Sequence, residues 1–164
     1  MFTKALGEAR WIFAILIAGW LIAIPFLPEL GFLFAGLILF TFYFFRDPER
    51  VPPEGENIAV SPADGVVTTI DEIDEDEFFN KRVRRIGIFL SVLDVHVNRA
   101  PLAGEVTHSI PKPGGFFDAR DPRCSILNQS RSWVFSGPVA MVMVKQITGA
   151  IARMVARHAG RIIV

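Results

Sequence analysis

The sequence contains little of several residue types that mark common classes of protein. It has one cysteine, Cys124, in 164 residues, which excludes an internal disulfide and a cysteine-rich metal site. Its 17 basic and 17 acidic residues cancel, so no basic field argues for a nucleic-acid partner. A Gly-rich phosphate loop, a His-Glu-x-x-His helix and a Gly-x-Ser-x-Gly turn are also missing from it. These absences leave few standard catalytic motifs to consider.

Charge is scarce near the N-terminus. From residue 11 to residue 45 the only charged residue is Glu29. The apolar runs on either side of it, 11–27 and 30–45, are at or slightly below the roughly 17–25 residues with which a helix crosses a bilayer. We therefore expect residues 1–50 to form a membrane-associated helical hairpin, which either spans the bilayer or re-enters from one side. A buried helical hairpin in a soluble core is the alternative.

Basic residues flank the apolar region on both sides. Lys4 and Arg10 precede it, and Arg46 and Arg50 follow it. Because basic residues stay on the cytoplasmic side of a membrane, both ends of the hairpin should be cytoplasmic. This predicts a protein at the cell membrane whose remaining domain, residues 51–164, lies on the cytoplasmic face.

Residues 51–164 read as short apolar stretches separated by Gly and Pro turns. Such a pattern is typical of a mainly β domain with short antiparallel strands, and we expect a sandwich-like arrangement. Two strands are expected at 133–135 and 139–145, around a turn at 136–138. The acidic stretch at 71–80 is expected to be a solvated loop or a hairpin tip.

One stretch combines a buried strand pattern with chemically useful side chains. From Ile86 the chain is apolar, and it then delivers Asp94, His96 and Asn98 in quick succession. If strand alternation continued, these three side chains would share one face. They would place an acid, an imidazole and an amide together. A strand end with a solvated face is the alternative explanation.

A second polar turn is Ser61-Pro-Ala-Asp-Gly65, which we expect to join short strands at 58–60 and 66–70. It makes Asp64 a further candidate site residue. Asp-Gly is also a common hairpin dipeptide, so turn structure alone would explain it.

Four segments together resemble the short, membrane-bound form of phosphatidylserine decarboxylase. The Asp-Val-His-Val-Asn-Arg stretch is the most specific of them, and the order and spacing of all four match. The segments are Phe44-Phe-Arg-Asp-Pro-Glu-Arg50, Ser61-Pro-Ala-Asp-Gly65, Phe89-Leu-Ser-Val-Leu-Asp-Val-His-Val-Asn-Arg-Ala-Pro-Leu-Ala-Gly104 and Gln146-Ile-Thr-Gly-Ala-Ile-Ala-Arg153.

This resemblance implies a proenzyme that cuts itself before a serine, usually within a Gly-Ser step. The serine becomes a pyruvoyl group at the N-terminus of a small α chain, and the larger β chain keeps the membrane segment. No serine in this sequence follows a glycine. The resemblance therefore implies a β chain, or a proenzyme truncated before its processing site, that needs a pyruvoyl-bearing α chain as partner.

The implied activity is decarboxylation of phosphatidylserine to phosphatidylethanolamine in phospholipid biosynthesis. Loss of carbon dioxide leaves an electron pair that no ordinary side chain stabilises, whereas a pyruvoyl group that forms a Schiff base with the lipid amine can accept it. A proton must then reach the same carbon. His96 is the natural donor, because an imidazole titrates near neutral pH.

The resemblance also implies how the proenzyme matures. His96, oriented by Asp64, would activate the serine hydroxyl in an Asp-His-Ser arrangement. Longer members of the family carry a second histidine three places after the first, where this chain has Arg99. Arg99 and Asn98 are therefore candidates for binding the carboxylate or phosphate of the substrate.

A competing hypothesis is a membrane-anchored β domain that binds lipid or a partner protein without catalysis. An acyl-carrier-type sandwich is weaker, since no lysine stands at an obvious hairpin tip. We expect no metal site, and a homo-oligomer is left open by the sequence.

Overall fold

The computed structural model describes residues 7, 9–55, 57–138 and 140–150. The chain divides into two compact units, one made of residues 1–51 with 63–98 and the other of residues 52–62 with 99–164. Each unit holds one antiparallel sheet, with two strands in the first and three in the second. The prediction of a mainly β domain is confirmed to this extent. The domain boundary near residue 50 stays a prediction.

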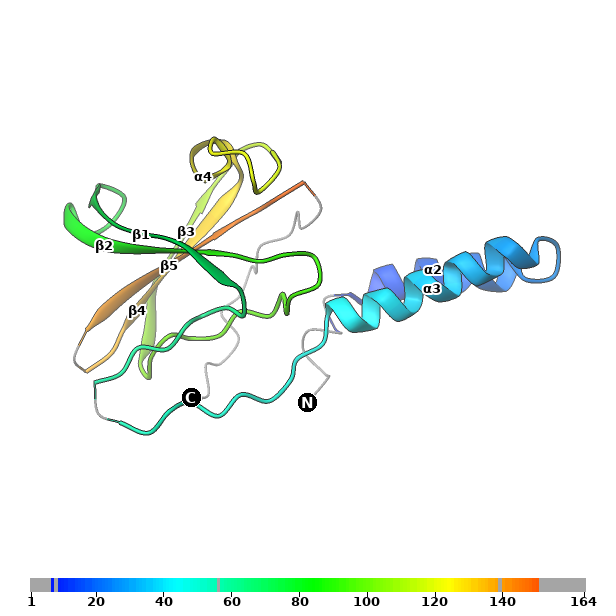
Figure 1. Ribbon diagram of the computed structural model, residues 1–164, viewed down its shortest axis with the longest axis horizontal. Coiled ribbons are helices and arrows are strands. Elements are labelled where there is room, and N and C mark those ends of the chain that lie inside the picture. Colours follow the sequence, from blue (N-terminus) through cyan, green and yellow to red (C-terminus); the bar gives the residue numbers. More distant parts are fainter. Residues whose placement is uncertain (1–6, 8, 56, 139, 151–164) are drawn as a thin grey trace. The chain divides into compact units, whose positions relative to one another are not determined.

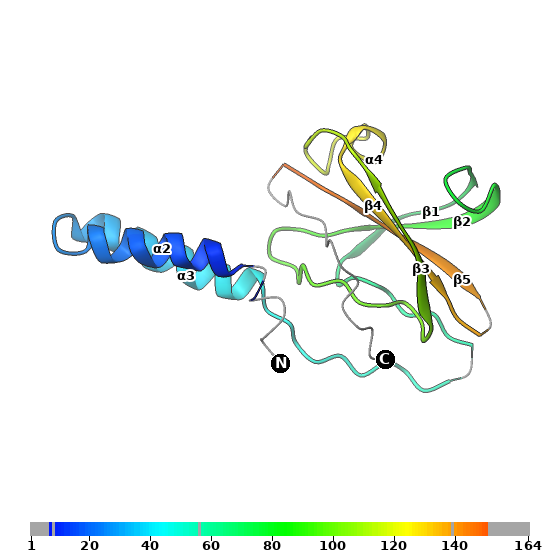
Figure 2. The same cartoon turned by 180° about the vertical axis from the view of Figure 1, so that it is seen from behind.

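Two apolar helices, α2 (Arg10–Ala23) and α3 (Pro28–Phe44), lie side by side in the first unit (Figures 1 and 2). The rings of Phe13 and Phe42 meet between them, with centroids 4.4 Å apart. At Gly19 an added Cβ would lie 2.7 Å from the ring of Phe34, so the missing side chain lets the helices approach closely. Aromatic packing and a small residue therefore hold the pair together.

Most large side chains of these helices are exposed. Phe26 at the turn is 80% exposed, Phe32 is 74% exposed and Trp11 is 69% exposed. Pro28 begins α3, where its missing N–H costs no helical hydrogen bond. Among the residues that the structure describes, no helix has both the length and the hydropathy needed to cross a membrane.

The first unit also contains a two-stranded antiparallel ribbon of β1 (Val66–Glu75) and β2 (Lys81–Phe89). The stretch 71–80, expected to be a solvated loop or a hairpin tip, belongs to β1 as far as Glu75, and residues 76–80 form the tip of the hairpin. The prediction was therefore wrong for 71–75 only. The reason lies in the partner strand, since Asp71 lies opposite Arg85 and each acidic position of β1 faces a basic one of β2. Opposite charges directly across an antiparallel pair stabilise the pairing.

A buried carboxylate closes the end of this ribbon. Glu75 is only 6% exposed, and its carboxylate accepts hydrogen bonds from the backbone N–H groups of Glu77, Phe78 and Phe79. The N···O distances are 2.7, 3.1 and 2.6 Å. Because a buried charge requires compensating hydrogen bonds, these three donors explain why an acid is tolerated at this position.

The second unit is built on a three-stranded sheet in the order β3-β4-β5, with antiparallel neighbours. Its middle strand supplies much of the core, because Trp133, Val134 and Phe135 are all nearly inaccessible. The strands expected at 133–135 and 139–145 are confirmed as β4 and β5, although residue 139 lies outside the described part of the structure and β5 begins at Met141. The strand bounds are β3 Glu105–Lys112, β4 Ser130–Ser136 and β5 Met141–Ile147.

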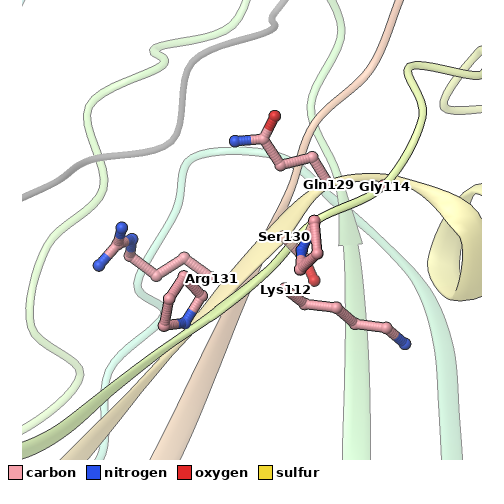
Figure 3. Close-up of a pocket in the computed structure, with 7 residues that line it drawn as sticks. Lys112, Gly114, Gln129, Ser130 and Arg131 are labelled. Atoms are coloured by element: carbon pink, nitrogen blue, oxygen red, sulfur yellow. The ribbon is translucent and has the colours of Figure 1, made fainter.

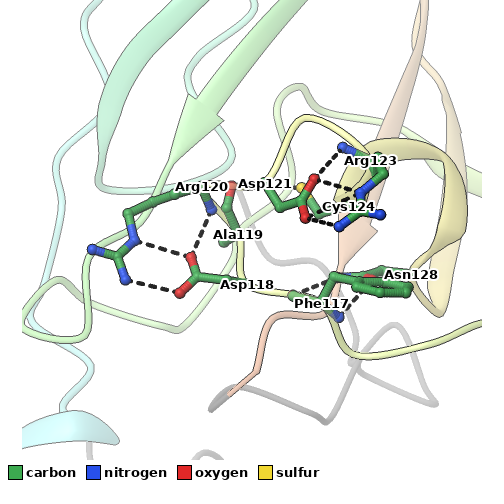
Figure 4. A network of polar contacts seen from close by, with 8 residues as sticks. All are labelled: Phe117, Asp118, Ala119, Arg120, Asp121, Arg123, Cys124 and Asn128. Carbon is green, nitrogen blue, oxygen red and sulfur yellow. Dashed lines mark hydrogen bonds and ion pairs between the residues drawn. The ribbon is translucent and has the colours of Figure 1, made fainter.

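A buried asparagine organises the loop between β3 and β4, just after the short helix α4 (Cys124–Leu127). Asn128 is 1% exposed, and its side-chain amide donates to the carbonyl oxygens of Phe117 and Thr148, at 2.9 and 2.6 Å. Its Oδ1 accepts from the backbone N–H of Phe117 at 2.8 Å (Figure 4). The side chain is thus bonded through both of its polar atoms, which ties the loop to the end of β5.

The same loop carries two salt bridges between aspartate and arginine side chains. Asp118 binds Arg120, and Asp121 binds Arg123, with closest N···O distances of 2.8 and 2.7 Å (Figure 4). Hydrogen bonds from these guanidinium groups lower the pKa of both carboxyl groups. The basic side chains are therefore largely neutralised within the loop.

Candidate functional site

The two motifs expected to carry the chemistry meet at one end of the β1–β2 ribbon. Val66, the first residue of β1, pairs with Phe89, the last residue of β2. The turn with Asp64 leads into this pair, and the segment with His96 leaves it. Gly65 stands between Asp64 and Val66, and an added Cβ there would be 2.5 Å from the carbonyl oxygen of Phe89. A glycine after Asp64 therefore permits the close approach of the turn to the strand end.

The segment after β2 does not continue as a strand. The backbone N–H of Asp94 donates to the carbonyl of Ser91 at 3.0 Å, and the carboxylate of Asp94 accepts from the N–H of Ser91 at 2.7 Å. These two bonds close a turn directly after Phe89, the end of β2. The expectation that Asp94, His96 and Asn98 share one strand face is therefore wrong. The carboxylate of Asp94 bonds to the local backbone, as short polar side chains in turns commonly do.

His96 is half-buried and is held on two sides. Its Nδ1 lies 3.0 Å from the carbonyl oxygen of Asp94, and because a carbonyl only accepts, Nδ1 is the donor. The imidazole stacks on the ring of Phe44, with centroids 4.1 Å apart and planes inclined by 24°. Within the described part of the chain, Nε2 makes no hydrogen bond. The ring thus has a fixed orientation and one nitrogen available for proton transfer.

Asp64 forms a salt bridge with Arg50, which the sequence had not indicated as a site residue. The Nη2 of Arg50 lies 2.8 Å from one carboxylate oxygen and its Nε lies 3.5 Å from the other. Their side chains are 50% and 34% exposed, respectively. The only feature of the sequence that could have indicated this role is that Arg50 ends the Phe-Arg-Asp-Pro-Glu-Arg motif of the family resemblance.

The structure shows no hydrogen bond between Asp64 and His96, both of which it describes. Their assignment as a catalytic pair stays a prediction. The short strand expected at 58–60 is not formed.

The other two candidate residues follow His96. Asn98 is half-buried, as is Arg99, whose backbone N–H donates to the carbonyl of Pro62 at 2.8 Å. The N–H of Val60 donates to the carbonyl of Pro101 at 2.7 Å. Residues 60–62 and 99–101 therefore run beside one another in the second unit. Substrate binding by Asn98 and Arg99 stays a prediction.

A shallow pocket of about 330 Å³ lies elsewhere, at the loop end of β3 and β4. Its two cations, Lys112 and Arg131, point away from one another (Figure 3). The register agrees, since Lys112 pairs with Ser130 and Pro111 with Arg131. No single anion is enclosed by both cations, and none of the predicted site residues lines this pocket.

The described residues contain no cluster of three or more histidine, cysteine and acidic side chains placed to hold a metal ion. Cys124 is partly covered, and its thiol lies 3.5 Å from the carbonyl of Ala119. Burial raises the pKa of this thiol, which keeps it protonated and unreactive near neutral pH.

The model of the phosphatidylserine decarboxylase family matches residues 37–161, a range that contains His96, Asp64 and Arg50. The last motif quoted above, 146–153, falls within this range, although residues 151–153 lie outside the described part of the structure.

Several curated relatives are called phosphatidylserine decarboxylase proenzyme. That of Symbiobacterium thermophilum is 43% identical over 130 residues, which cover 77% of this chain and 59% of the relative. That of Carboxydothermus hydrogenoformans is 42% identical over 126 residues, with the same two shares. That of Salinibacter ruber is 41% identical over 152 residues, or 91% of this chain and 63% of the relative. This chain thus spans about three fifths of the length of these relatives. On the extent of the family match, the chain belongs to the phosphatidylserine decarboxylase family.

Proposed function

We propose that this chain is the β-chain part of a phosphatidylserine decarboxylase, and that it forms phosphatidylethanolamine by releasing carbon dioxide from phosphatidylserine. The observation that carries the proposal is the way in which the imidazole of His96 is held. Within the segment that matches the family, its imidazole is held by a carbonyl and an aromatic ring, while Nε2 makes no hydrogen bond to any described residue.

The tautomer of His96 suits proton transfer in either direction. With the proton on Nδ1 directed at the carbonyl of Asp94, a neutral imidazole presents Nε2 as a base. Once protonated there, the same nitrogen becomes an acid. His96 would first take the proton of the serine hydroxyl during self-cleavage and, in the mature enzyme, deliver a proton to the carbon that has lost its carboxylate.

A companion α chain would carry the pyruvoyl group that this chemistry needs. That group supplies the electron sink for the pair left by decarboxylation. The residues present fit it, because the half-buried imidazole of His96 has one nitrogen that could hold and deliver a proton for this chemistry. This chain would therefore orient the proton donor and bind the lipid.

Asp64 would support His96 during maturation. Asp64 precedes β1 by two residues, and the first residue of β1, Val66, pairs with Phe89. Phe89 is the last residue of β2, and the segment that carries His96 follows it. The contact with Arg50 holds the carboxylate at this end of the ribbon. Asp64 would then orient the imidazole, or stabilise its charge, when the serine is activated.

Arg99 and Asn98 would bind the anionic headgroup. A guanidinium matches both carboxylate and phosphate through paired N–H donors, and a carboxamide adds a neutral donor. Both side chains directly follow the proton donor in sequence.

We infer that α2 and α3 form a hairpin that associates with the cell membrane and that the β domain lies on its cytoplasmic face. Their exposed apolar side chains support this, as does an apolar groove of about 320 Å³ near the turn between them. The groove is lined by Gly19, Ile22, Ala23, Phe26, Leu27, Leu30 and Phe34. We also infer a sandwich-like β domain, which the short antiparallel strands in each of the two units support.

The test is maturation and turnover of the full-length gene product. Mass spectrometry should find two chains, the smaller with a blocked, carbonyl-bearing N-terminus, and the mixture should release carbon dioxide from phosphatidylserine. The Asp64→Asn and His96→Ala variants should remain uncut. Normal cleavage in both variants would refute the triad, and a wild-type protein without a carbonyl-bearing chain would favour a non-catalytic lipid- or protein-binding domain.

A further inference from the structure

The end of helix α3 contacts the segment that carries His96 at two separate points. Phe44, the last residue of α3, stacks on the imidazole at a centroid distance of 4.1 Å. Tyr43 and Arg46 both donate to the carbonyl oxygen of Leu93, at 3.1 and 2.8 Å. An apolar helix therefore reaches both the histidine ring and the backbone three residues before it.

Tyr43 and Arg46 act as one unit. The guanidinium of Arg46 lies 3.8 Å from the centroid of the Tyr43 ring, and its Nη1 donates to the Tyr43 carbonyl at 2.9 Å. The ring face and the carbonyl thus fix the guanidinium while its other nitrogen binds Leu93. Such a stacked, doubly bonded arginine loses little further freedom when it holds a third group.

The held carbonyl connects directly to the imidazole. Leu93 precedes Asp94, whose two hydrogen bonds to Ser91 close the turn and whose carbonyl accepts from Nδ1 of His96. A displacement of the Leu93 carbonyl would move the Asp94 carbonyl and with it the orientation of the imidazole. Phe44 limits the remaining freedom, which is rotation of the ring out of its plane.

We propose that Phe44, together with the Tyr43–Arg46 pair, positions the imidazole of His96 for proton transfer. The end of the apolar helix would thereby help to hold the catalytic histidine in its orientation. This inference rests on the proposed function. The three residues touch neither substrate nor reacting atoms in the proposal, so they are positioning residues.

The main test compares Phe44→Leu with Phe42→Leu in the full-length, processed protein. Both variants lose an aromatic ring from the same helix, but Phe42 packs on Phe13 instead of on the histidine. We expect Phe44→Leu to lower kcat about tenfold with little change in KM, since a full 1 Å misplacement costs roughly a hundredfold. Phe44→Tyr should restore kcat and Phe42→Leu should keep it.

A second measurement reports the stacking without relying on activity. Ring protons that lie over an aromatic face are shifted upfield in NMR spectra, and the sequence has only three histidines to assign. The His96 resonances should be upfield in the wild type and in Phe44→Tyr, and should lose that shift in Phe44→Leu. Tyr43→Phe removes one hydroxyl donor, so it should lower kcat by about threefold, the equivalent of one modest hydrogen bond.

Equal loss of kcat in Phe42→Leu and Phe44→Leu would overturn the proposal, because it would indicate general helix packing. An unshifted His96 resonance in the wild type would overturn it as well. If Phe44→Leu does not fold, the wild-type spectrum and Tyr43→Phe still decide the question. A wild-type protein without decarboxylase activity would sink the proposed function, whereas the His96 resonance would still show whether Phe44 holds the ring.

Discussion

The loop of the three-stranded sheet and the end of the β1–β2 ribbon hold their polar side chains in different ways. Asn128 is fully buried and bonded through both polar atoms of its amide. His96 is half-buried and bonded through one ring nitrogen only. A buried side chain whose polar atoms all have hydrogen-bond partners stabilises a fold. A ring that is held in place but keeps one nitrogen without a hydrogen bond to the described residues suits proton transfer. We therefore expect a change at Asn128 to cost mainly stability and, on the proposed function, a change at His96 to cost mainly activity.

Replacement of His96 by Ala should produce the largest effect on activity. Loss of a general acid or base typically costs roughly 10² to 10⁴ in rate, so carbon dioxide release from phosphatidylserine should fall by that factor or more. The thermal unfolding temperature should change little, because the imidazole makes one hydrogen bond and one stacking contact.

The matched control is His108→Ala, which removes an exposed imidazole from β3. Activity should stay close to that of the wild type. Comparable losses in the two variants would contradict the assignment of the proton donor to His96.

Replacement of Asn128 by Ala should produce the opposite pattern. It leaves the N–H and carbonyl of Phe117 and the carbonyl of Thr148 without their partner, so the free energy of unfolding should fall by about 3 kcal/mol. Denaturant titration measures this loss. Ser125→Ala in the neighbouring helix should be nearly neutral, since its exposed hydroxyl bonds only to the local carbonyl of Pro122.

The Arg50→Ala variant tests the ribbon end for a structural role. The Arg50–Asp64 pair is well exposed to water, so its loss should change the free energy of unfolding by less than about 1 kcal/mol. A double-mutant cycle with Asp64→Asn isolates the pair. A coupling much larger than that would show that Asp64 serves the fold and would weaken its proposed catalytic role.

The smallest effect concerns acid stability of the ribbon. A side-chain hydrogen bond from Arg85 lowers the pKa of Asp71 below its ordinary value of 3.8. The unfolded chain therefore binds this proton more readily, so the stabilisation is complete above that value and is lost as the pH falls below it. Between about pH 5 and pH 2, wild-type stability should fall slightly more than that of Asp71→Asn; identical acid profiles would contradict the ion pair.

The sequence was informative where its pattern was local. Short apolar stretches and a Gly-Pro turn predicted the strands around residues 136–138, and the two apolar runs coincide with α2 and α3. The motif around His96 pointed to the family that the comparison then showed. Each of these features is contained within one continuous stretch of chain.

The sequence failed where a distant partner decides the local structure. The acidic stretch that starts at Asp71 looks like a loop until Arg85 lies opposite it. Asp94 looks like a site residue, yet its carboxylate closes a turn with Ser91. The stacking of Phe44 on His96 joins residues 52 positions apart, which no spacing rule reveals. Such pairings arise only once the chain has folded.

The carboxylate of Glu75 has a further consequence for the ribbon. Every acid of β1 has a basic partner on β2, so charge alone selects the partner strand but would tolerate a slip along it. Two-stranded ribbons with polar faces are prone to such slips. Because Glu75 receives the N–H groups of residues 77–79, it fixes which residues make the turn. One acidic side chain thereby sets the phase of both strands from Glu75 back to Thr69. An irregularity between Val67 and Thr69 then shifts the register by one residue, and this shift places Val66 opposite Phe89 at the far end.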